Sequence, residues 1–306
     1  MGKNRTWKKV KTARQLYLML FLPLLYLAVF CYAPMFGIQI AFKDFSYRKG
    51  IWGSEWIGLE HFIDFLTDRK FYQYLINTLR ISVYAMVAGN IVPVFLALCL
   101  NIIRPGIFKK SVQMISYLPH FISVVVLCGI LIQMMNPIVG LYGNLAQLLT
   151  GERPPDVLSI PSAYPHLHVW SGVWQNAGWN SIIYTAALAN SDQQLHEAAQ
   201  IDGANRLQRI WHIDIPAILP TFVILVIMNA GRLMSVGYEK VLLLQNSLNL
   251  SYSEIISTYV YKQAFASSRA DFGYSTAVGL FDSAINIILL VLVNLLSKKV
   301  TETSLW

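Results

Sequence analysis

The sequence predicts an all-α integral membrane protein with six transmembrane helices. Of its 306 residues, 55% are hydrophobic and only 13% are charged, whereas a soluble domain carries about 25% charged residues. Six apolar segments are long enough to cross a hydrocarbon core about 30 Å thick, which takes about 20 helical residues. The composition therefore excludes a soluble enzyme with a large core.

The first apolar segment, 16–42, follows a basic tail and resembles a secretory signal. It is too long for the apolar part of such a signal, and no small-residue cleavage site follows it, so we expect an uncleaved first span. The other predicted spans are 77–103, 111–135, 166–190, 217–236 and 274–297. The fourth is the least hydrophobic because it contains Gln175, Asn176 and Asn180, which predicts that it faces protein or water rather than lipid.

Basic residues predict the orientation, because they concentrate in short cytoplasmic segments. If the N-terminus is cytoplasmic, the inner segments 1–14, 104–110, 191–216 and 298–306 hold 13 Lys and Arg residues. The much longer outer loops 43–76, 137–165 and 237–273 hold 9. We therefore expect a multi-pass protein of the cell membrane, with a cytoplasmic basic tail (1–14), a transmembrane domain (15–300) and a cytoplasmic C-terminal tail (301–306). The basic tail faces anionic lipid in this interpretation, and nucleic acid is not expected as a partner.

The sequence contains no motif for nucleotide, metal or nucleophilic chemistry. The phosphate loop GxxxxGK[ST], the nucleophile elbow and HExxH are all missing. Cys31, Cys99 and Cys128 lie in apolar segments without CxxC spacing, which favours small hydrophobic packing residues over a disulfide or metal site. We therefore expect neither an enzyme nor a cofactor or metal in this chain.

The segment 191–216 is amphipathic and lies between two apolar spans. Ser191 and Gln194 have the spacing of a capping box at a helix start. Gly203 is expected to break this helix, and a second short helix over 204–214 would place Leu207 and Trp211 on one face. The sequence alone leaves two interpretations open: a helix resting on lipid headgroups, or a docking element for a protein.

This segment resembles the EAA loop of ABC importer permeases. The matching residues are Glu197, Ala198, Ala199, Asp202, Gly203, Ala204, Ile210, Ile213 and Pro216. The resemblance implies the type I (MetI-like) permease fold, with 191–216 as coupling helices that enter a cleft of a cytoplasmic ATPase. Glu197 and Gly203 would lie at the centre of that contact.

Further stretches resemble the carbohydrate-uptake branch of the family. SEWIGLEHFIDFL, ISYLPHFIS and VWQNAGWNSIIYTAAL look like its signatures, and 237–265 is similar to the subgroup that imports uronate-containing oligosaccharides. The resemblance implies a second homologous permease subunit in a heterodimer, two ATPase subunits that bind ATP and Mg, and an extracytoplasmic solute-binding protein. The substrate would be an oligosaccharide.

Polar residues within the predicted spans are candidates for the substrate path, because lipid penalises them. They are Asn77, Arg80, Trp174, Gln175, Asn176, Asn180, Asn229, Arg232 and Asp282. Arg80 and Arg232 could offset the charge of a uronate, and Trp174 could stack on a sugar ring. Three alternatives stay open: these residues join helices to one another, with Arg232 pairing with Asp282; the protein is an ion-coupled secondary transporter that uses that pair; or it is an ABC permease for another solute. His120, alone in the third span, is expected to be a hydrogen-bonded packing residue.

Overall fold

The computed structural model describes residues 13–267 and 270–301. Nearly all of the predicted tails, 1–14 and 301–306, therefore lies outside the described residues. The regular elements of the described chain are helices apart from one two-stranded sheet, in which β1 (Lys43–Asp44) pairs antiparallel with β2 (Glu55–Trp56).

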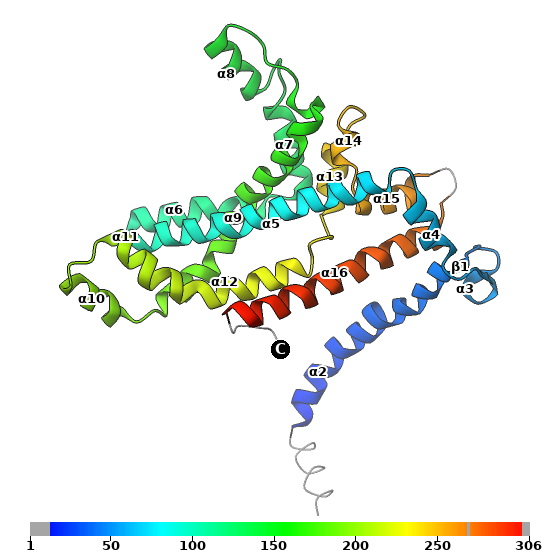
Figure 1. The fold of residues 1–306 in the computed structure, drawn as a ribbon, viewed down its shortest axis with the longest axis horizontal. Coiled ribbons are helices and arrows are strands. Elements are labelled where there is room, and N and C mark those ends of the chain that lie inside the picture. Colours follow the sequence, from blue (N-terminus) through cyan, green and yellow to red (C-terminus); the bar gives the residue numbers. More distant parts are fainter. Residues whose placement is uncertain (1–12, 268–269, 302–306) are drawn as a thin grey trace, which may run out of the picture.

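Four long helices lie side by side and form the centre of the fold (Figure 1). They are α5 (Phe71–Ile102), α9 (Tyr164–Ala189), α12 (Ile215–Ala230) and α16 (Phe272–Thr301). Small residues such as Ala88 and Ala177 lie buried between α5 and α9, and Ala97 packs beside Tyr184 farther along the same helices. Small side chains permit the close helix approach that association in lipid requires.

The structure contains four helices that are long and apolar enough to cross a membrane, namely Arg14–Phe42, Phe71–Ile102, Arg206–Ala230 and Phe272–Lys299, all within the described residues. A fifth is counted if the bent third segment is one span. The predicted fourth span corresponds to α9, whose 26 residues are long enough but whose polar residues keep it out of that count. Six spans therefore stay a prediction.

The first predicted span is a continuous helical rod that stands away from the bundle (Figure 1). It consists of α2 (Arg14–Tyr26), the π-helical turns η1 (Leu27–Tyr32) and the 3-10 helix η2 (Ala33–Phe42). Neither α2 nor η1 has a buried residue, and only η2 packs on α16. Cys31 is therefore exposed on this rod rather than buried as expected, whereas Cys128 is buried.

The third predicted span, 111–135, is not one straight helix. It is divided into α6 (Ile107–Tyr117), η3 (Leu118–Phe121) and α7 (Val124–Met134), and the axis bends by 101°. Ile122 and Ser123 are extended, and the Ser123 hydroxyl accepts a hydrogen bond from the Val126 amide, which caps a new helix. The periodicity of the sequence did not reveal this bend. Helix α8 (Leu141–Thr150) and the short turns η4 (Val157–Ser159) and η5 (Pro161–Ala163) follow.

Short elements cover one end of the bundle. They are α3 (Gly50–Gly53), α4 (Glu60–Thr67), α13 (Tyr238–Leu244), α14 (Leu250–Ser253), α15 (Ile256–Tyr261) and η7 (Lys262–Ala266). The opposite end carries α10 (Gln193–Ile201), α11 (Arg206–Arg209) and η6 (Ile210–Asp214) (Figure 1). The elements within the predicted outer loops 43–76 and 237–273 thus lie at one end of the bundle, and the segment 191–216 lies at the other.

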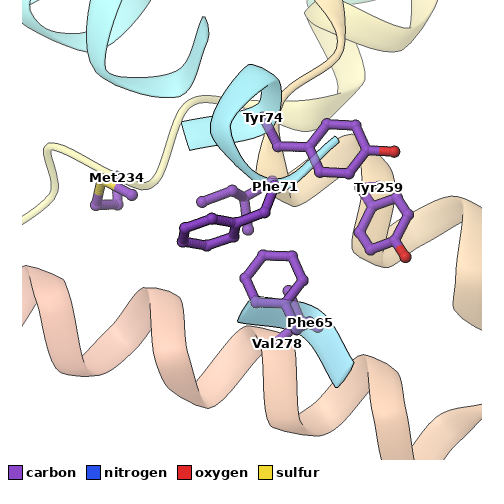
Figure 2. Close-up of a cluster of buried hydrophobic side chains, with 7 residues drawn as sticks. Phe65, Phe71, Tyr74, Met234, Tyr259 and Val278 are labelled. Carbon is purple, nitrogen blue, oxygen red and sulfur yellow. The ribbon is translucent and has the colours of Figure 1, made fainter. Parts of the chain in front are cut away.

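An aromatic cluster joins the covering elements to the long helices (Figure 2). It contains Phe65, Phe71, Tyr74, Met234, Ile256, Tyr259 and Val278. Phe65 and Phe71 meet edge to face at 5.1 Å, and Tyr74 stacks on Tyr259 at 4.5 Å between ring centroids; such pairs add about 0.5–1.5 kcal/mol each beyond burial. Met234, fully buried, anchors the segment that follows α12.

Candidate functional site

A cavity of about 440 Å³ opens between α5, α9, the end of α12 and α13. Its polar lining residues include Asn90, Gln175, Asn176, Asn180, Asn229, Arg232 and Lys240. Five of them, Gln175, Asn176, Asn180, Asn229 and Arg232, are among the residues that the sequence singled out. The fold therefore brings together side chains from separate predicted spans around one space.

Arg232 does not belong to the fifth helix, although the predicted span extended to residue 236. Helix α12 ends at Ala230, and an irregular segment, 231–237, connects it to α13. Asn286 of α16 holds this segment: its Oδ1 accepts from the Met234 amide at 2.8 Å and its Nδ2 donates to Ser235 Oγ at 3.1 Å. The backbone amide that a helix would pair internally is thus satisfied from α16, and the segment carries Arg232 to the cavity.

Lys240 is a cavity residue that sequence reasoning missed, because it was assigned to an outer loop. Its Nζ donates to the His168 carbonyl oxygen of α9 at 2.7 Å. Burial lowers the pKa of Lys240 to about 8, and the nearby Cys128 opposes this shift. With Arg232, it gives the cavity two basic side chains, and none of the described residues that line it is Asp or Glu.

Several amides at the cavity already have partners. Gln175 Nε2 donates to the Ile122 carbonyl at 2.7 Å. Asn176 Nδ2 donates to the Gly172 carbonyl, and its Oδ1 accepts from His120 Nδ1 at 2.9 Å. Both residues therefore hold the bend of the third segment as well as lining the cavity.

Asn229 is also bound, since its Nδ2 donates to Asn90 Oδ1 at 3.0 Å. Asn180 and the guanidinium of Arg232, by contrast, have no side-chain hydrogen bond within the described part of the chain. These two groups are free to bind a ligand.

His120 and Trp179 are arranged for packing. His120 stacks on Trp179 with ring centroids 4.6 Å apart, which agrees with its expected packing role. Trp174 is 54% exposed and does not line the cavity. Trp174 is thus separate from this cavity, and its role as a platform for a sugar stays a prediction.

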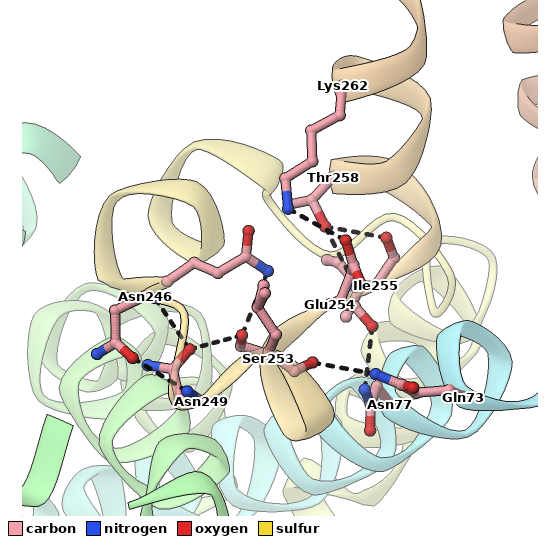
Figure 3. Close-up of polar contacts among 11 residues, drawn as sticks. Gln73, Asn77, Asn246, Asn249, Ser253, Glu254, Ile255, Thr258 and Lys262 are labelled. Atoms are coloured by element: carbon pink, nitrogen blue, oxygen red, sulfur yellow. Dashed lines mark hydrogen bonds and ion pairs between the residues drawn. The ribbon is translucent and has the colours of Figure 1, made fainter. Parts of the chain in front are cut away.

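Asn77 and Arg80 also lie outside the cavity lining. Asn77 Nδ2 donates to the carbonyls of Ser251 and Glu254, at 3.0 Å each (Figure 3). The guanidinium carbon of Arg80 lies 4.4 Å from the Tyr252 ring centroid. Asn77 thus pairs carbonyls of that segment, which need partners when buried, and Arg80 adds a cation–π contact, so both side chains hold the α14 region on α5.

The same region carries a saturated polar network around Asn249, which is fully buried (Figure 3). Its Nδ2 donates to the Leu158 and Leu244 carbonyls, and its Oδ1 accepts from Ser253 Oγ. A buried network in which every group is paired is rigid. It therefore joins the end of α13 to η4 and α14, and Asn77 holds α14 on α5.

Asp282 faces a second cavity of about 330 Å³, which Tyr238, Tyr261 and Phe265 also line. The two cavities share no lining residue. Among the described residues, Asp282 forms no ion pair with Arg232. The pairing considered from the sequence is therefore absent. A secondary transporter built on that pair loses its structural basis.

The 191–216 segment folds as two helical pieces, with corrected starts. The N-cap of α10 is Asp192, whose Oδ1 accepts from the Gln194 amide, whereas the Ser191 hydroxyl donates to the Leu188 carbonyl. The capping box occurs instead at Asn205 and Gln208, so the second piece begins at Arg206 rather than at 204 and continues into α12. The side-chain oxygens of Asp192 and Asn205 accept hydrogen bonds from first-turn amides, which explains both starts.

The coupling element, defined as 191–216, exposes five of its nine matched residues, and the other four are half-buried. Gly203 has φ +80°, a conformation that favours glycine, and it separates the two pieces. Ala199, Asp202, Gly203 and Ala204 line a shallow hollow of about 330 Å³, while Glu197, Ala198 and Pro216 lie exposed near it. Ile201, Leu207 and Trp211 are 86%, 75% and 69% exposed. Exposed apolar residues rimmed by polar ones indicate a surface that binds protein or membrane.

The sequence of this chain matches the family model described as "Binding-protein-dependent transport system inner membrane component" over residues 89–302, more than half of its length. The chain belongs to this family. The family predicted from the EAA loop is therefore confirmed, and the protein is a multi-pass membrane permease.

Relatives support the same assignment. Protein LplB of Bacillus subtilis (strain 168) is 39% identical over 306 residues, covering 100% of this chain and 95% of LplB. The polygalacturonan/rhamnogalacturonan transport system permease protein YteP of the same organism is 40% identical over 304 residues, covering 99% of this chain and 94% of YteP. The predicted place in the carbohydrate-uptake branch is thereby confirmed.

The permease is also similar to a chain in the crystal structure of a bacterial alginate ABC transporter in complex with an alginate pentasaccharide-bound periplasmic protein. The TM-score is 0.88 at 32% identity, with 98% of this chain and 100% of that chain covered. The all-α ABC importer permease fold is confirmed by this match.

Proposed function

We propose that this permease imports uronate-containing oligosaccharides and that the cavity lined by Arg232 and Lys240 lies on the substrate path. The main evidence is the charge of that cavity: two basic side chains line it, and no carboxylate does so among the described residues. YteP and the alginate transporter, whose names refer to acidic polysaccharides, support this substrate class.

The cavity suits such a substrate chemically. A carboxylate that leaves water loses hydration, and it is stabilised only by an opposite charge or by hydrogen-bond donors. Arg232 offers a planar guanidinium without a competing partner, and the Asn180 amide can bind sugar hydroxyls. A neutral or cationic solute would gain nothing from the two positive charges.

We further propose that the coupling element binds a separate ATPase subunit that carries ATP and Mg. Its apolar, exposed residues at one end of the bundle support this docking role. In this arrangement both termini are cytoplasmic, two ATPase subunits lie beneath two homologous permease subunits, and a solute-binding protein delivers the oligosaccharide from the other side. The unpacked flank of α2 and η1 would contact lipid or the second permease.

Uptake by the complete transporter in vesicles tests the substrate class. The substrates are an oligogalacturonate and its carboxyl-reduced counterpart, in which each carboxylate is replaced by a primary alcohol. Arg232→Gln should reduce uptake of the acidic sugar by about tenfold or more, the value of one charge-assisted hydrogen bond, and affect the neutral sugar far less. Arg153→Gln, an exposed cation outside the cavity, is the matched control. An equal loss for both sugars would contradict the proposal.

A further inference from the structure

Helix α10 stands off from the bundle at the end that carries the coupling element (Figure 1). Its ends are held by short turns: the Ser191 hydroxyl donates to the Leu188 carbonyl, and the Ala204 amide donates to the Ala199 carbonyl at 2.8 Å. Of the polar side chains of α10, all of which are described, only that of His196 contacts a polar group of the bundle. Among the polar contacts, one side chain therefore holds the middle of the helix.

The partner of His196 is a buried carboxylate. His196 Nε2 lies 3.4 Å from Asp214 Oδ1, and the Asp214 side chain is only 5% exposed. The same oxygen accepts a hydrogen bond from Asn101 Nδ2 at 3.2 Å. Asp214 ends η6, which continues directly into α12, and Asn101 lies at the end of α5. One oxygen atom thus connects α10, the start of α12 and the end of α5.

We propose that the junction of His196, Asp214 and Asn101 transmits the movement of α10 to α5 and α12, and that His196 is a positioning residue for energy coupling. This inference rests on the proposed function, since it assumes that an ATPase moves α10. Without the junction, α10 could pivot about its two terminal turns while the bundle stays still. With the junction, a displacement of α10 pulls on two of the helices that border the cavity.

The junction suits this role because its buried end, at Asp214, cannot rearrange without a large cost in free energy. Asp214 is buried, so loss of a donor leaves a carboxylate oxygen with fewer partners in a site that water hardly reaches. The contact to His196, by contrast, lies at the surface side, where the imidazole is 21% exposed. Removing the imidazole should therefore uncouple α10 without unfolding the permease.

The test uses the complete transporter, co-produced with its ATPase, second permease and binding protein, in sealed vesicles with an oligogalacturonate. The measured quantity is the number of sugars imported per ATP hydrolysed. His196→Ala should lower this ratio by about tenfold, while the ATPase subunit co-purifies in the wild-type amount. His196→Gln, whose amide can donate to Asp214, should restore most of the ratio. Gln193→Ala, an exposed change on the same helix, should leave it unchanged.

The outcomes separate the two proposals. If the wild-type complex shows no ATP-dependent uptake, the proposed function fails before any variant is compared. If the wild type is active and His196→Ala imports as many sugars per ATP as it does, the coupling role of the junction is overturned alone. A defect in His196→Gln equal to that of His196→Ala, or a loss of uptake that merely follows a loss of bound ATPase, would also overturn it.

Discussion

Lys240 Nζ donates to the main-chain oxygen of His168 at 2.7 Å, and this bond joins α13 to α9 across one side of the cavity. The segment that carries Lys240, which was predicted to be an outer loop, is therefore part of the cavity wall rather than a free loop. It is held there by the network around Asn249 and by Asn77. The position of the second cation thus depends on residues that never contact a substrate.

The first prediction concerns pH. Burial lowers the pKa of Lys240 to about 8 from an ordinary value near 10.5, so its charge falls as the pH rises through that value. Uptake of an oligogalacturonate, relative to its carboxyl-reduced counterpart, should therefore decline between about pH 7 and pH 9. Measuring both sugars in the same vesicles cancels the pH dependence of the ATPase.

The control for this prediction is Lys240→Arg, which keeps its charge over that range. The relative uptake of the variant should stay constant with pH. A wild-type ratio that does not change with pH, or an identical decline in Lys240→Arg, would show that Lys240 does not contribute charge to the site.

Gly203 gives a prediction for ATPase docking. At φ +80° an added Cβ meets open space, so Gly203→Ala is disfavoured by backbone strain alone, at about 1–2 kcal/mol. Co-purification of the ATPase subunit should decrease in Gly203→Ala and be largely retained in Gly203→Asn, because Asn tolerates this conformation. Equal retention in both variants would argue that the turn geometry is unimportant for docking.

A side chain at Gly178 should destabilise the packing of α9 on α6. A Cβ there would collide with the Ser116 carbonyl of α6, and overpacking of this kind costs about 1–3 kcal/mol. Gly178→Ala should lower the thermal unfolding midpoint of the purified complex. Gly129→Ala is the matched control, since nothing lies within 4 Å of its added Cβ. An unchanged midpoint in Gly178→Ala would contradict the close packing of α9 on α6.

The sequence predicted the helices better than their boundaries and breaks. Hydropathy located the apolar segments because lipid solvation acts on every residue of a span. The bend at 122–123 and the end of α12 at Ala230 depend on tertiary partners, namely Gln175 for the first and Asn286 for the second. Such contacts join residues far apart in the sequence and leave no periodic pattern.

The sequence predicted only part of the candidate site, because the partners of its polar side chains depend on the tertiary fold. Arg232 and Asn180 were found because polar residues in apolar segments are conspicuous. Lys240 was missed because a lysine in a polar loop is not conspicuous. Asn77 and Arg80 were equally conspicuous, yet they bind the α14 region. Polarity therefore indicated that a residue needs a partner, but not whether that partner is substrate or protein.

The selection of acidic sugars by Arg232 and Lys240 is tested most directly in the double variant Arg232→Gln, Lys240→Gln. The measured quantity is the uptake ratio of oligogalacturonate to its carboxyl-reduced counterpart. Each lost charge-assisted hydrogen bond is worth about 1.5–3 kcal/mol, so the account predicts that the preference of the wild type for the acidic sugar disappears while the neutral sugar is still imported. A wild-type ratio in the double variant, with both sugars reduced alike, would contradict the claim that these two cations select the substrate.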